Sequence, residues 1–387
     1  MSTPSLSDDA LLEAVALRNQ HKTLKDAAAA AGLSWNAFQN RLMRAASRGL
    51  DGSIPEPLPL GQQVRGASTL YAKNESGEWE QRVQWVKTTR DAAEQAATMR
   101  TVVDALLEEI PRVNPTAGPK QANELLLNQY TVTDLHFGML AWAEETGDAD
   151  YDLKIAEKLL VDWFSAAIAM SPNAAVGVLA QLGDLMHHDA LESVTPAHKH
   201  VLDADSRLQK VIRVVIRVIR QIIGMLLQKH PRVHIVMASA NHDPASSAWM
   251  REMLHAMYEN EPRVSVDNSP DIYYVYEWGK TALFYHHGHK RKLANVDSVF
   301  AGKFREIFGR CPKSYGHIGH LHNDEAKDSN LMKVERHRTL APSDAYASSG
   351  GWLSERDAKV ITYHREFGEV FRSTLSPEMV QGANDGR

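Results

Sequence analysis

Residues 315–322 read Tyr-Gly-His-Ile-Gly-His-Leu-His, and the interpretation of the whole chain starts from this stretch. His320 and His322 are separated by one residue and follow a short strand-like run, so both imidazoles can turn toward one point and present nitrogen ligands to a metal. Because the chain carries 18 histidines, such a pair can also arise by chance. Four earlier segments of the chain strengthen the prediction that this pair binds a metal.

Those four segments also place ligand-type side chains directly after an apolar, strand-like run. They are Asp134-Leu135-His136, Gly183-Asp184-Leu185-Met186-His187, Asn241-His242-Asp243 and His287-Gly288-His289. The strands predicted before the five segments span residues 125–132, 176–182, 233–238, 281–285 and 314–318. Open α/β sheets gather their chemistry beyond the carboxyl ends of their strands. We therefore expect segments about 190 residues apart in the sequence to converge in space.

The bulk composition is that of an ordinary globular protein. The 387 residues are 43% hydrophobic and 24% charged, enough for one large domain or two to three small ones. A single cysteine, Cys311, excludes an intrachain disulfide and fits a reducing compartment. No signal-peptide-like or bilayer-spanning run is found, so we expect a cytoplasmic protein without a membrane partner. The net charge of −5 gives no global nucleic-acid signature, so any such binding depends on local patches.

Residues 1–50 are predicted to form a small domain of three helices. The first begins near Ser7, the second spans about residues 24–31, and Ser34 caps the third. The short Ala-rich helix, the Gly-Leu-Ser turn and the Arg-bearing helix resemble a helix-turn-helix. In that interpretation Arg41 and Arg44 contact DNA, together with the neighbouring polar side chains of the third helix. The alternative is a three-helix module that binds protein.

Residues 51–120 are predicted to be a linker that contains two ordered elements. Prolines at positions 55, 57 and 59 indicate an extended spacer, and a β-hairpin is expected around residues 74–77. Residues 90–110 are predicted to form an amphipathic helix, whose apolar face either supports a homo-oligomer or packs within the chain. A main domain follows at residues 121–375, and residues 376–387 are expected to be a flexible tail.

The donor groups at the strand ends are carboxylates, an amide and imidazoles, without a thiolate. They are Asp134, Asp184, Asn241, His136, His287, His320 and His322. This mixture suits Mn²⁺, Fe or Zn²⁺ rather than a cysteine-built structural zinc site or an all-oxygen Ca²⁺ site. Seven donors are too many for one tetrahedral ion but suit two ions that share a carboxylate. Two ions about 3.5–4 Å apart clamp the attacking and leaving oxygens of a phosphoryl displacement.

In this order the five segments resemble the signature of calcineurin-like metallophosphoesterases: D-x-H, G-D, N-H-D/E, H and G-H-x-H. The resemblance covers about residues 125–330. It implies an α/β (α+β) fold, a four-layer αββα sandwich, here joined to the small N-terminal three-helix domain. It also implies two divalent ions, with Mn²⁺ as the first choice and Fe or Zn²⁺ as alternatives.

The resemblance assigns each donor to an ion. One ion would be held by Asp134, His136, Asp184 and His322. The other would be held by Asp184, Asn241, His287 and His320, with Asp184 shared.

The resemblance also implies catalytic roles for side chains that bind no metal. His242 would lie near the scissile phosphate and protonate the leaving oxygen, and Asp243 could orient its imidazole. The form Gly183-Asp184-Leu185-Met186-His187 is similar to the G-D-x-x-H form of the family's double-strand-break repair nucleases. In those nucleases a second histidine reaches the substrate phosphate, so His187 is a further catalytic candidate.

Two details depart from the family pattern. The family usually has glycine before its Asn-His-Asp, and this chain has Ala240. The ligand in the segment 286–289 is taken to be His287 because the family's ligand precedes a glycine. His286 and His289 remain possible substitutes.

Three functions remain open from the sequence. The first is a two-metal DNA nuclease or phosphodiesterase that uses a hydroxide held between the ions. It is favoured by the N-terminal helices, by His187 and by the basic run Lys290-Arg291-Lys292, which is otherwise a solvated loop. The second is a phosphomonoesterase or small-nucleotide phosphodiesterase, and the third is a non-catalytic DNA-binding or scaffold protein. The layout also resembles phage and prophage proteins that couple a small helical domain to a phosphoesterase, for which the host cytoplasm is expected.

Overall fold

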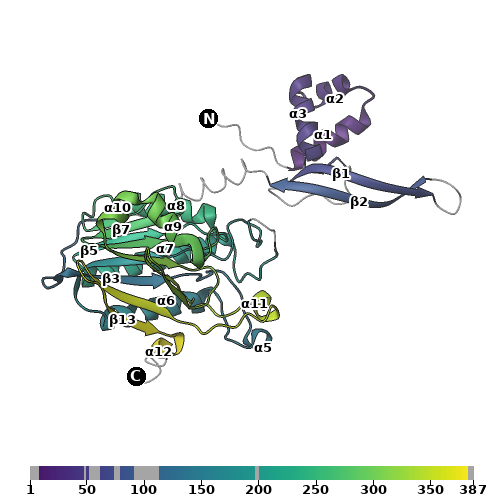
Figure 1. Ribbon diagram of the computed structural model, residues 1–387. Coiled ribbons are helices and arrows are strands. Elements are labelled where there is room, and N and C mark those ends of the chain that lie inside the picture. The colour runs from purple at the N-terminus through teal and green to yellow at the C-terminus, as the bar shows by residue number, and fades with distance from the viewer. Residues whose placement is uncertain are drawn as a thin grey trace. The chain divides into compact units, whose positions relative to one another are not determined.

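The structure is a computed structural model that describes residues 8–47, 49–51, 62–73, 79–90, 113–196 and 200–381 (Figure 1). The chain divides into two units, residues 1–104 and residues 105–387. The strongest of the sequence signals lie in the second unit.

The first unit begins with three helices, as the sequence predicts: α1 (Asp8–Gln20), α2 (Leu24–Ala30) and α3 (Trp35–Ser47). The side chain of Thr23 accepts a hydrogen bond from the amide of Asp26, and Ser34 Oγ accepts one from Ala37, so short polar residues begin α2 and α3. Phe38 is fully buried against alanines of α1 and α2. The predicted third helix therefore packs by the face that carries Phe38, while Trp35 at its first residue is exposed.

The predicted hairpin is present as strands β1 (Gln62–Lys73) and β2 (Trp79–Arg90), which pair antiparallel. Irregularities in the register lie between Val64 and Gly66 and between Leu70 and Tyr71. The proline spacer, the turn of the hairpin and most of the predicted amphipathic helix lie outside the described residues.

The second unit contains two mixed sheets. The six-stranded sheet has the order β13-β12-β3-β4-β5-β6. Its strands are β3 (Asn123–Val132), β4 (Ala174–Gln181), β5 (Arg232–Met237), β6 (Val264–Val266), β12 (Ala358–His364) and β13 (Gly368–Leu375). The five-stranded sheet has the order β10-β11-β9-β8-β7. Its strands are β7 (Tyr274–Trp278), β8 (Thr281–Tyr285), β9 (Lys313–Ile318), β10 (Glu325–Asp328) and β11 (Lys333–Arg336).

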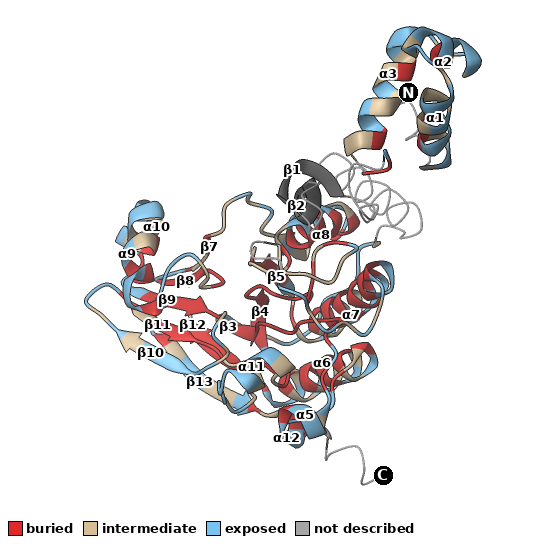
Figure 2. Ribbon diagram, turned by 90° about the vertical axis from the view of Figure 1, so that its right-hand side faces the viewer, coloured by how far each residue is buried: buried red, intermediate tan, exposed pale blue. Residues whose placement is uncertain are grey.

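The two sheets pack face to face with helices on both outer sides, as Figures 1 and 2 show. Apolar side chains of both sheets, among them Val178 and Leu283, form one buried cluster between them. Helices α6 (Leu153–Met170), α7 (Leu208–Lys229) and α8 (Pro244–Met257) cover the six-stranded sheet, and α9 (Leu293–Lys303) with α10 (Arg305–Arg310) covers the other. This is the predicted four-layer αββα sandwich. Every residue of β4 is buried, as expected for a parallel strand covered on both faces.

All five strands predicted before the ligand segments are present, namely β3, β4, β5, β8 and β9. The expected flexible tail differs from the structure, because residues Pro377–Gln381 form the short helix α12. Val380 is 3% exposed, so burial of this apolar side chain holds the helix against the domain. Residues 382–387 lie outside the described residues.

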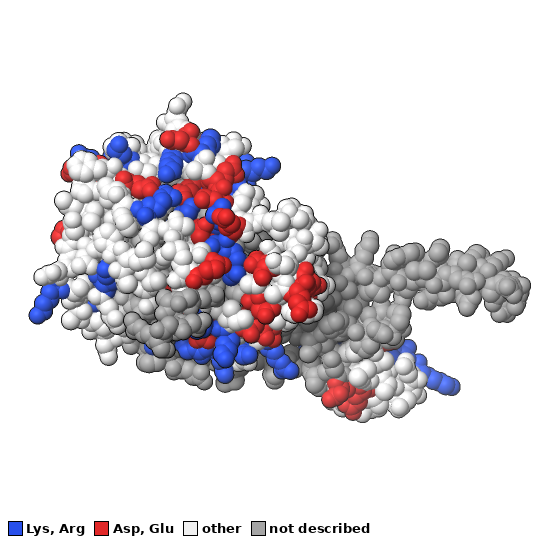
Figure 3. Space-filling view, turned by 90° about the horizontal axis from the view of Figure 1, so that it is seen from below, with Lys and Arg blue, Asp and Glu red and all other residues white. Residues whose placement is uncertain are grey.

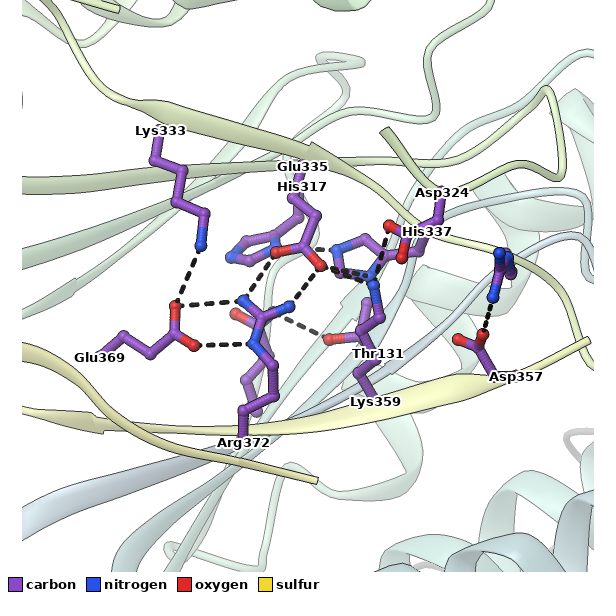
Figure 4. Close-up of polar contacts among 12 residues, drawn as sticks. Thr131, His317, Asp324, Lys333, Glu335, His337, Asp357, Lys359, Glu369 and Arg372 are labelled. Carbon is purple, nitrogen blue, oxygen red and sulfur yellow. Dashed lines mark hydrogen bonds and ion pairs between the residues drawn. The ribbon is translucent and has the colours of Figure 1, made fainter. Parts of the chain in front are cut away.

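Charged side chains join the two sheets in their interior (Figure 4). Glu335 of β11 accepts hydrogen bonds from Lys359 of β12 at 2.7 Å and from Arg372 of β13 at 2.5 and 2.7 Å. Glu335 and Lys359 are 3% and 4% exposed. Because a buried charge without a partner is strongly unfavourable, these contacts fix how β11 meets the two antiparallel strands of the other sheet.

Among the helices of the described residues, none is both long enough and apolar enough to cross a bilayer.

Candidate metal centre

The predicted donors meet where the carboxyl ends of strands from both sheets come together. Asp134 and His136 follow β3, Asp184 follows β4, and Asn241 follows β5, all in the six-stranded sheet. The remaining three donors, His287, His320 and His322, follow β8 and β9 of the five-stranded sheet. The site is therefore shared between the two sheets, and neither could form it alone.

The first group of donors consists of Asp134, His136 and His322, whose ligand atoms lie within 4.8 Å of one another. Asp134 Oδ1 is 3.1 Å from His322 Nε2. The other oxygen, Oδ2, accepts hydrogen bonds from the amide of His320 at 2.9 Å and from Thr133 Oγ1. These contacts hold the carboxylate so that Oδ1 faces the histidine donors.

The second group consists of Asp184, His287 and His320, again within 4.8 Å. His287 Nε2 lies 3.1 Å from Asp184 Oδ2 and 3.0 Å from Asn241 Oδ1. On the other side of the ring, Nδ1 lies 2.9 Å from the carbonyl oxygen of Leu182. Because a carbonyl can only accept, Nδ1 carries a proton, and Nε2 is the nitrogen that would bind a metal in place of its own proton.

The two groups adjoin, since Asp134 Oδ1 is 4.0 Å from His287 Nε2. Two carboxylates, one amide oxygen and four imidazoles therefore surround one small volume, which fits divalent Mn, Fe or Zn. The single thiol, Cys311, is buried elsewhere, beside the carbonyl of Gly279. The residues present thus fit two divalent ions, and the sharing of Asp184 between them stays a prediction.

The carboxylates of the centre are ionised. Burial would raise the pKa of Asp184, but the adjacent His287 lowers it well below its usual value. The pKa of Asp134 is likewise lowered, against the effect of burial, by His322 and His287. Conversely, burial would lower the pKa of His287, while Asp184 and Asp134 raise it to about 9. Two buried carboxylates need positive charge nearby to neutralise them, so this site is suited to bind cations.

Backbone strain is concentrated at the same residues. Among the described residues, five that are not glycine have positive φ, and all five are predicted ligands: Asp134 (51°), His136 (46°), Asp184 (49°), His320 (79°) and His322 (56°). Such a conformation costs roughly 1–2 kcal/mol per residue and persists only where the surroundings demand it. This observation is independent of the family resemblance and points to the same side chains.

Gly183 explains how the centre tolerates Ala240. Gly183 has φ of 108°, and a Cβ atom there would lie 2.6 Å from the Cβ of Ala240 and 2.6 Å from Nδ1 of His287. The methyl group of Ala240 therefore occupies space that is available only because residue 183 has no side chain. The departure from the family pattern at Ala240 leaves His287 undisturbed.

His242 and His187 lie beside the first group of donors. The ligand nitrogens of His136, His187 and His242 also fall within 4.8 Å of one another. The amide of His242 donates to Asp184 Oδ1 at 2.8 Å, and His242 Nδ1 lies 2.9 Å from the carbonyl oxygen of His187. His187 is 1% exposed, and its Nε2 has no hydrogen-bond partner among the described residues. The described part of the fold therefore leaves this buried nitrogen without a protein partner beside the first group of donors.

Asp243 does not orient the imidazole of His242 as expected. Its Oδ2 accepts a hydrogen bond from the amide of Met186 at 3.0 Å. The hydrogen bond of His242 Nδ1 is instead made to the carbonyl oxygen of His187. The orienting group is thus a backbone carbonyl, and Asp243 instead holds the loop after β4. Burial and the nearby Asp184 raise the pKa of Asp243 well above its usual value.

Asp189 is a positioning residue that the sequence did not reveal. Its carboxylate accepts hydrogen bonds from the amides of Ala245 and Ser246 at 2.6 and 2.7 Å, at the start of α8. It therefore ties the loop that carries His187 to the segment that carries His242. No local pattern marks it, since the two segments are far apart in the chain.

The geometry favours His287 over its two neighbours as the ligand. His286 stacks on Tyr273, with ring centres 4.3 Å apart, and its Nδ1 lies 2.9 Å from the carbonyl oxygen of Ile272. It therefore faces away from the donors. The ring of His289 is 5.4 Å from that of His287, but it belongs to neither donor group.

The residues expected to bind nucleic acid are accessible to different degrees. Lys290, Arg291 and Lys292 are exposed and lie between His289 and α9. On α3 of the first unit, Arg44 is exposed and Arg41 is half-buried. On the face of the protein in Figure 3, basic and acidic side chains are interspersed over the described residues. Contact with DNA by any of these residues stays a prediction.

The comparisons with known proteins give a fold likeness only. No family model matches the chain, and no curated protein matches it. Among solved structures, a predicted phosphoesterase from Streptococcus pneumoniae TIGR4 is 11% identical, with 66% of this chain and 99% of that chain covered and a TM-score of 0.26. A Vps29 from Entamoeba histolytica complexed with Zn²⁺ is 9% identical, with 65% and 99% covered and a TM-score of 0.28. The phosphopantetheinyl hydrolase of Mycobacterium tuberculosis is 10% identical, with 56% and 91% covered and a TM-score of 0.23. At these TM-scores the likeness carries no functional argument, so function is inferred from the side chains of the centre.

Proposed function

We propose that the protein is a two-metal phosphoesterase that hydrolyses phosphodiester bonds, with DNA as its substrate and Mn²⁺ as the first candidate ion. The observation that carries this proposal is the convergence of seven oxygen and nitrogen donors, from both sheets, into two adjoining groups. The concentration of positive φ at five of those donors supports it. A scaffold protein that no longer turns over would have no reason to retain strained ligands.

The ions would be held by the groups around Asp134 and around Asp184. When bound there, they supply a water that is acidic enough to lose its proton near neutral pH, and they neutralise charge on the phosphate oxygens. The ionised carboxylates of Asp134 and Asp184 hold this positive charge in a site that excludes most solvent, since both are at most 1% exposed.

The part of His242 is to move a proton. Its Nδ1 donates to the carbonyl oxygen of His187, which fixes the ring and leaves Nε2 for the substrate. When Nε2 is protonated, it can hand its proton to the oxygen that leaves phosphorus. The unpartnered Nε2 of His187 can donate to a non-bridging oxygen of the same phosphate. A diester has a poorer leaving group than an activated monoester, so this pair should matter most for diesters.

A second candidate is a phosphomonoesterase or small-nucleotide phosphodiesterase, because the same centre would serve either substrate. For DNA we rely on the exposed Lys290, Arg291 and Lys292 beside the centre. The helix-turn-helix-like arrangement of α2 and α3 supports the same substrate, with Arg44 exposed on it. Polymer binding through phosphates would make affinity fall steeply with salt, whereas binding of one nucleotide would not.

The proposal is tested by a Mn²⁺-dependent activity panel on the full chain. The panel contains single- and double-stranded DNA, RNA, cyclic nucleotides, a chromogenic monoester and a chromogenic diester. We expect hydrolysis of the diesters, lost on chelation and lost in Asp184→Asn, while the exposed Asp328→Asn keeps wild-type rates. Hydrolysis of monoesters alone would favour the second candidate. No hydrolysis of any ester by a metal-loaded protein would overturn the enzymatic account.

A further inference from the structure

Three loops next to the metal centre carry exposed aromatic side chains. Trp142 is 57% exposed, Tyr346 is 64% exposed, and Trp352 is 59% exposed, while His200 is also exposed. We call these four side chains the aromatic rim. Large exposed aromatic groups on neighbouring loops are unfavourable in water unless a ligand covers them, so they indicate a binding surface.

Two loops of the aromatic rim are hydrogen-bonded to the backbone of the metal centre. The loop that carries Trp142 starts with the hydrogen bond from the amide of Met139 to the carbonyl of His136, at 2.9 Å. The segment that leads to Tyr346 is held by Thr339 Oγ1, which donates to the carbonyl of Asp134 at 2.7 Å. His200 lies in the same connection as His187, between β4 and α7. The segments that lead to Trp142 and Tyr346 are therefore tied to the backbone of His136 and Asp134.

The same loops are joined into one surface. Ser348 Oγ, on α11 (Ala345–Ser349), donates to the carbonyl of Thr146, on α5 (Ala143–Thr146), at 3.0 Å, and the two helices lie side by side in Figures 1 and 2. The amide of Leu140 donates to the carbonyl of Asp203 at 3.0 Å. The ring of Tyr346 lies 6.1 Å from that of His200 and 5.4 Å from that of Trp352, between centres.

Trp352 is held in place by its own loop. Its amide donates to the carbonyl of Ala347 at 3.1 Å, and its indole lies against Gly350, where a Cβ atom would be 2.9 Å from the ring. The exposed rings of Trp352 and Tyr346 are therefore already arranged before a ligand arrives. A rigid aromatic surface loses little entropy on binding flat, apolar partners.

We propose that the aromatic rim stacks unpaired bases of a nucleic-acid strand whose phosphate lies at the metal centre. The substrate class is then single-stranded nucleic acid, or a duplex with an unpaired end, and intact duplex is a poor substrate. This inference rests on the proposed function for its placement of the phosphate. Base–aromatic stacking tolerates any sequence, because every base offers a flat face.

A basic run beside the centre supplies charge that a nucleic-acid backbone requires. The basic run Lys290-Arg291-Lys292 follows β8, whereas the loops of the aromatic rim follow β3 and β4 or lie beyond β11. A strand bound at the centre would place backbone phosphates near these cations and unpaired bases on the aromatic rim. A protein partner would also cover exposed rings, and it is treated below as an outcome of the test.

The test compares Trp352→Ala and Tyr346→Ala with two matched variants in the full chain. Trp352→Phe retains a ring, and Leu353→Ala removes an apolar side chain that is 82% exposed on the same loop. The substrates are a single-stranded oligonucleotide, an abasic oligonucleotide of equal length and a chromogenic diester. We expect Trp352→Ala to raise the KM for the oligonucleotide about tenfold, with Trp352→Phe and Leu353→Ala near wild type. The KM values for the abasic strand and the chromogenic diester should not change.

A binding assay separates failure of this inference from failure of the proposed function. In the presence of a chelator, quenching of tryptophan fluorescence and fluorescence anisotropy report binding of oligothymidylate and oligouridylate without turnover. Tighter binding of the base-bearing strand than of the abasic strand, lost in Trp352→Ala, supports the aromatic rim even if no ester is hydrolysed. Equal affinity for both strands would overturn it. A changed sedimentation coefficient of Trp352→Ala alone, with unchanged oligonucleotide affinity, would identify a protein interface and would also overturn it.

Discussion

His242 Nδ1 lies 2.9 Å from the carbonyl oxygen of His187. Two residues that the sequence placed in separate catalytic roles are thus linked, one through its ring and the other through its backbone. Because the carbonyl belongs to the loop after β4, the position of the proposed acid depends on a segment that also carries Asp184. Replacing the side chain of His187 leaves this carbonyl in place.

We predict that His242→Ala retains the bound metals and loses 100- to 10,000-fold in kcat on diesters, the usual range for a lost general acid. The loss should be smaller on a chromogenic diester, whose leaving group needs little protonation. Steady-state kinetics together with metal analysis test this. His255→Ala, at an exposed position of α8, is the matched control. Wild-type kcat on DNA in His242→Ala would remove the assigned role.

Gly183→Ala should destabilise the protein and weaken metal binding. The new methyl group would lie 2.6 Å from both Ala240 Cβ and His287 Nδ1, and φ of 108° is unfavourable for alanine. We expect a loss of about 2–4 kcal/mol in the free energy of unfolding, measured by urea denaturation. Gly302→Ala is the control, since that glycine is helical and has open space around its Cβ position. The double variant Gly183→Ala/Ala240→Gly should recover only part of the lost stability, because the new methyl group at residue 183 still contacts His287. Full recovery of the stability would show that the contact with His287 does not matter.

Glu335→Gln should cost about 3 kcal/mol of folding stability, because the buried Lys359 and the partly buried Arg372 each lose a charged partner. Urea unfolding measures this loss. Glu325→Gln is the matched control, since Glu325 is exposed and its contact with Arg336 should contribute at most about 1 kcal/mol. Equal effects of the two substitutions would show that the contacts between the sheets add nothing beyond a surface ion pair.

The free energy of unfolding should fall as the pH is lowered from about 6.5 toward 4, in part because of His230. Burial lowers the pKa of His230 to about 4, so the unfolded chain binds more protons across this window. The contribution of His230 is complete above the unfolded pKa and disappears as the pH falls through the folded one. It amounts to at most about 3 kcal/mol. His230→Gln should flatten the dependence of the unfolding free energy on pH, measured by urea denaturation across this window. The same dependence in His230→Gln and in wild type would contradict the prediction.

The strand ends explain how much of the centre could be predicted from sequence. Each donor follows a strand that can be recognised in the sequence by its apolar run. Asp184 and His320 could therefore be predicted to lie close together, because functional side chains in α/β sheets gather beyond the carboxyl ends of the strands. The choice between His286 and His287 could not be made from the alternation of β8, because both residues lie beyond its last residue, Tyr285. The family resemblance favours His287, which precedes Gly288, and the packing of His286 on Tyr273 agrees with that choice.

Other features depend on contacts between distant segments. Asp243 was wrongly paired with its neighbour His242 because the amide that it binds, that of Met186, is remote in sequence. Positive φ at His136 could not be predicted, since histidine has no preference for that conformation comparable to glycine. The aromatic rim escaped notice because loops carry no periodicity, and its rings come from three of them.

The central claim is that the donors hold two ions with Asp184 between them. The most direct measurement is the metal content per chain after loading with Mn²⁺ and removal of free ions, for wild type, Asp184→Asn and Asp328→Asn. We predict two ions per chain in wild type and in Asp328→Asn, and fewer than one in Asp184→Asn. Two ions retained by Asp184→Asn, or none bound by wild type, would contradict the account.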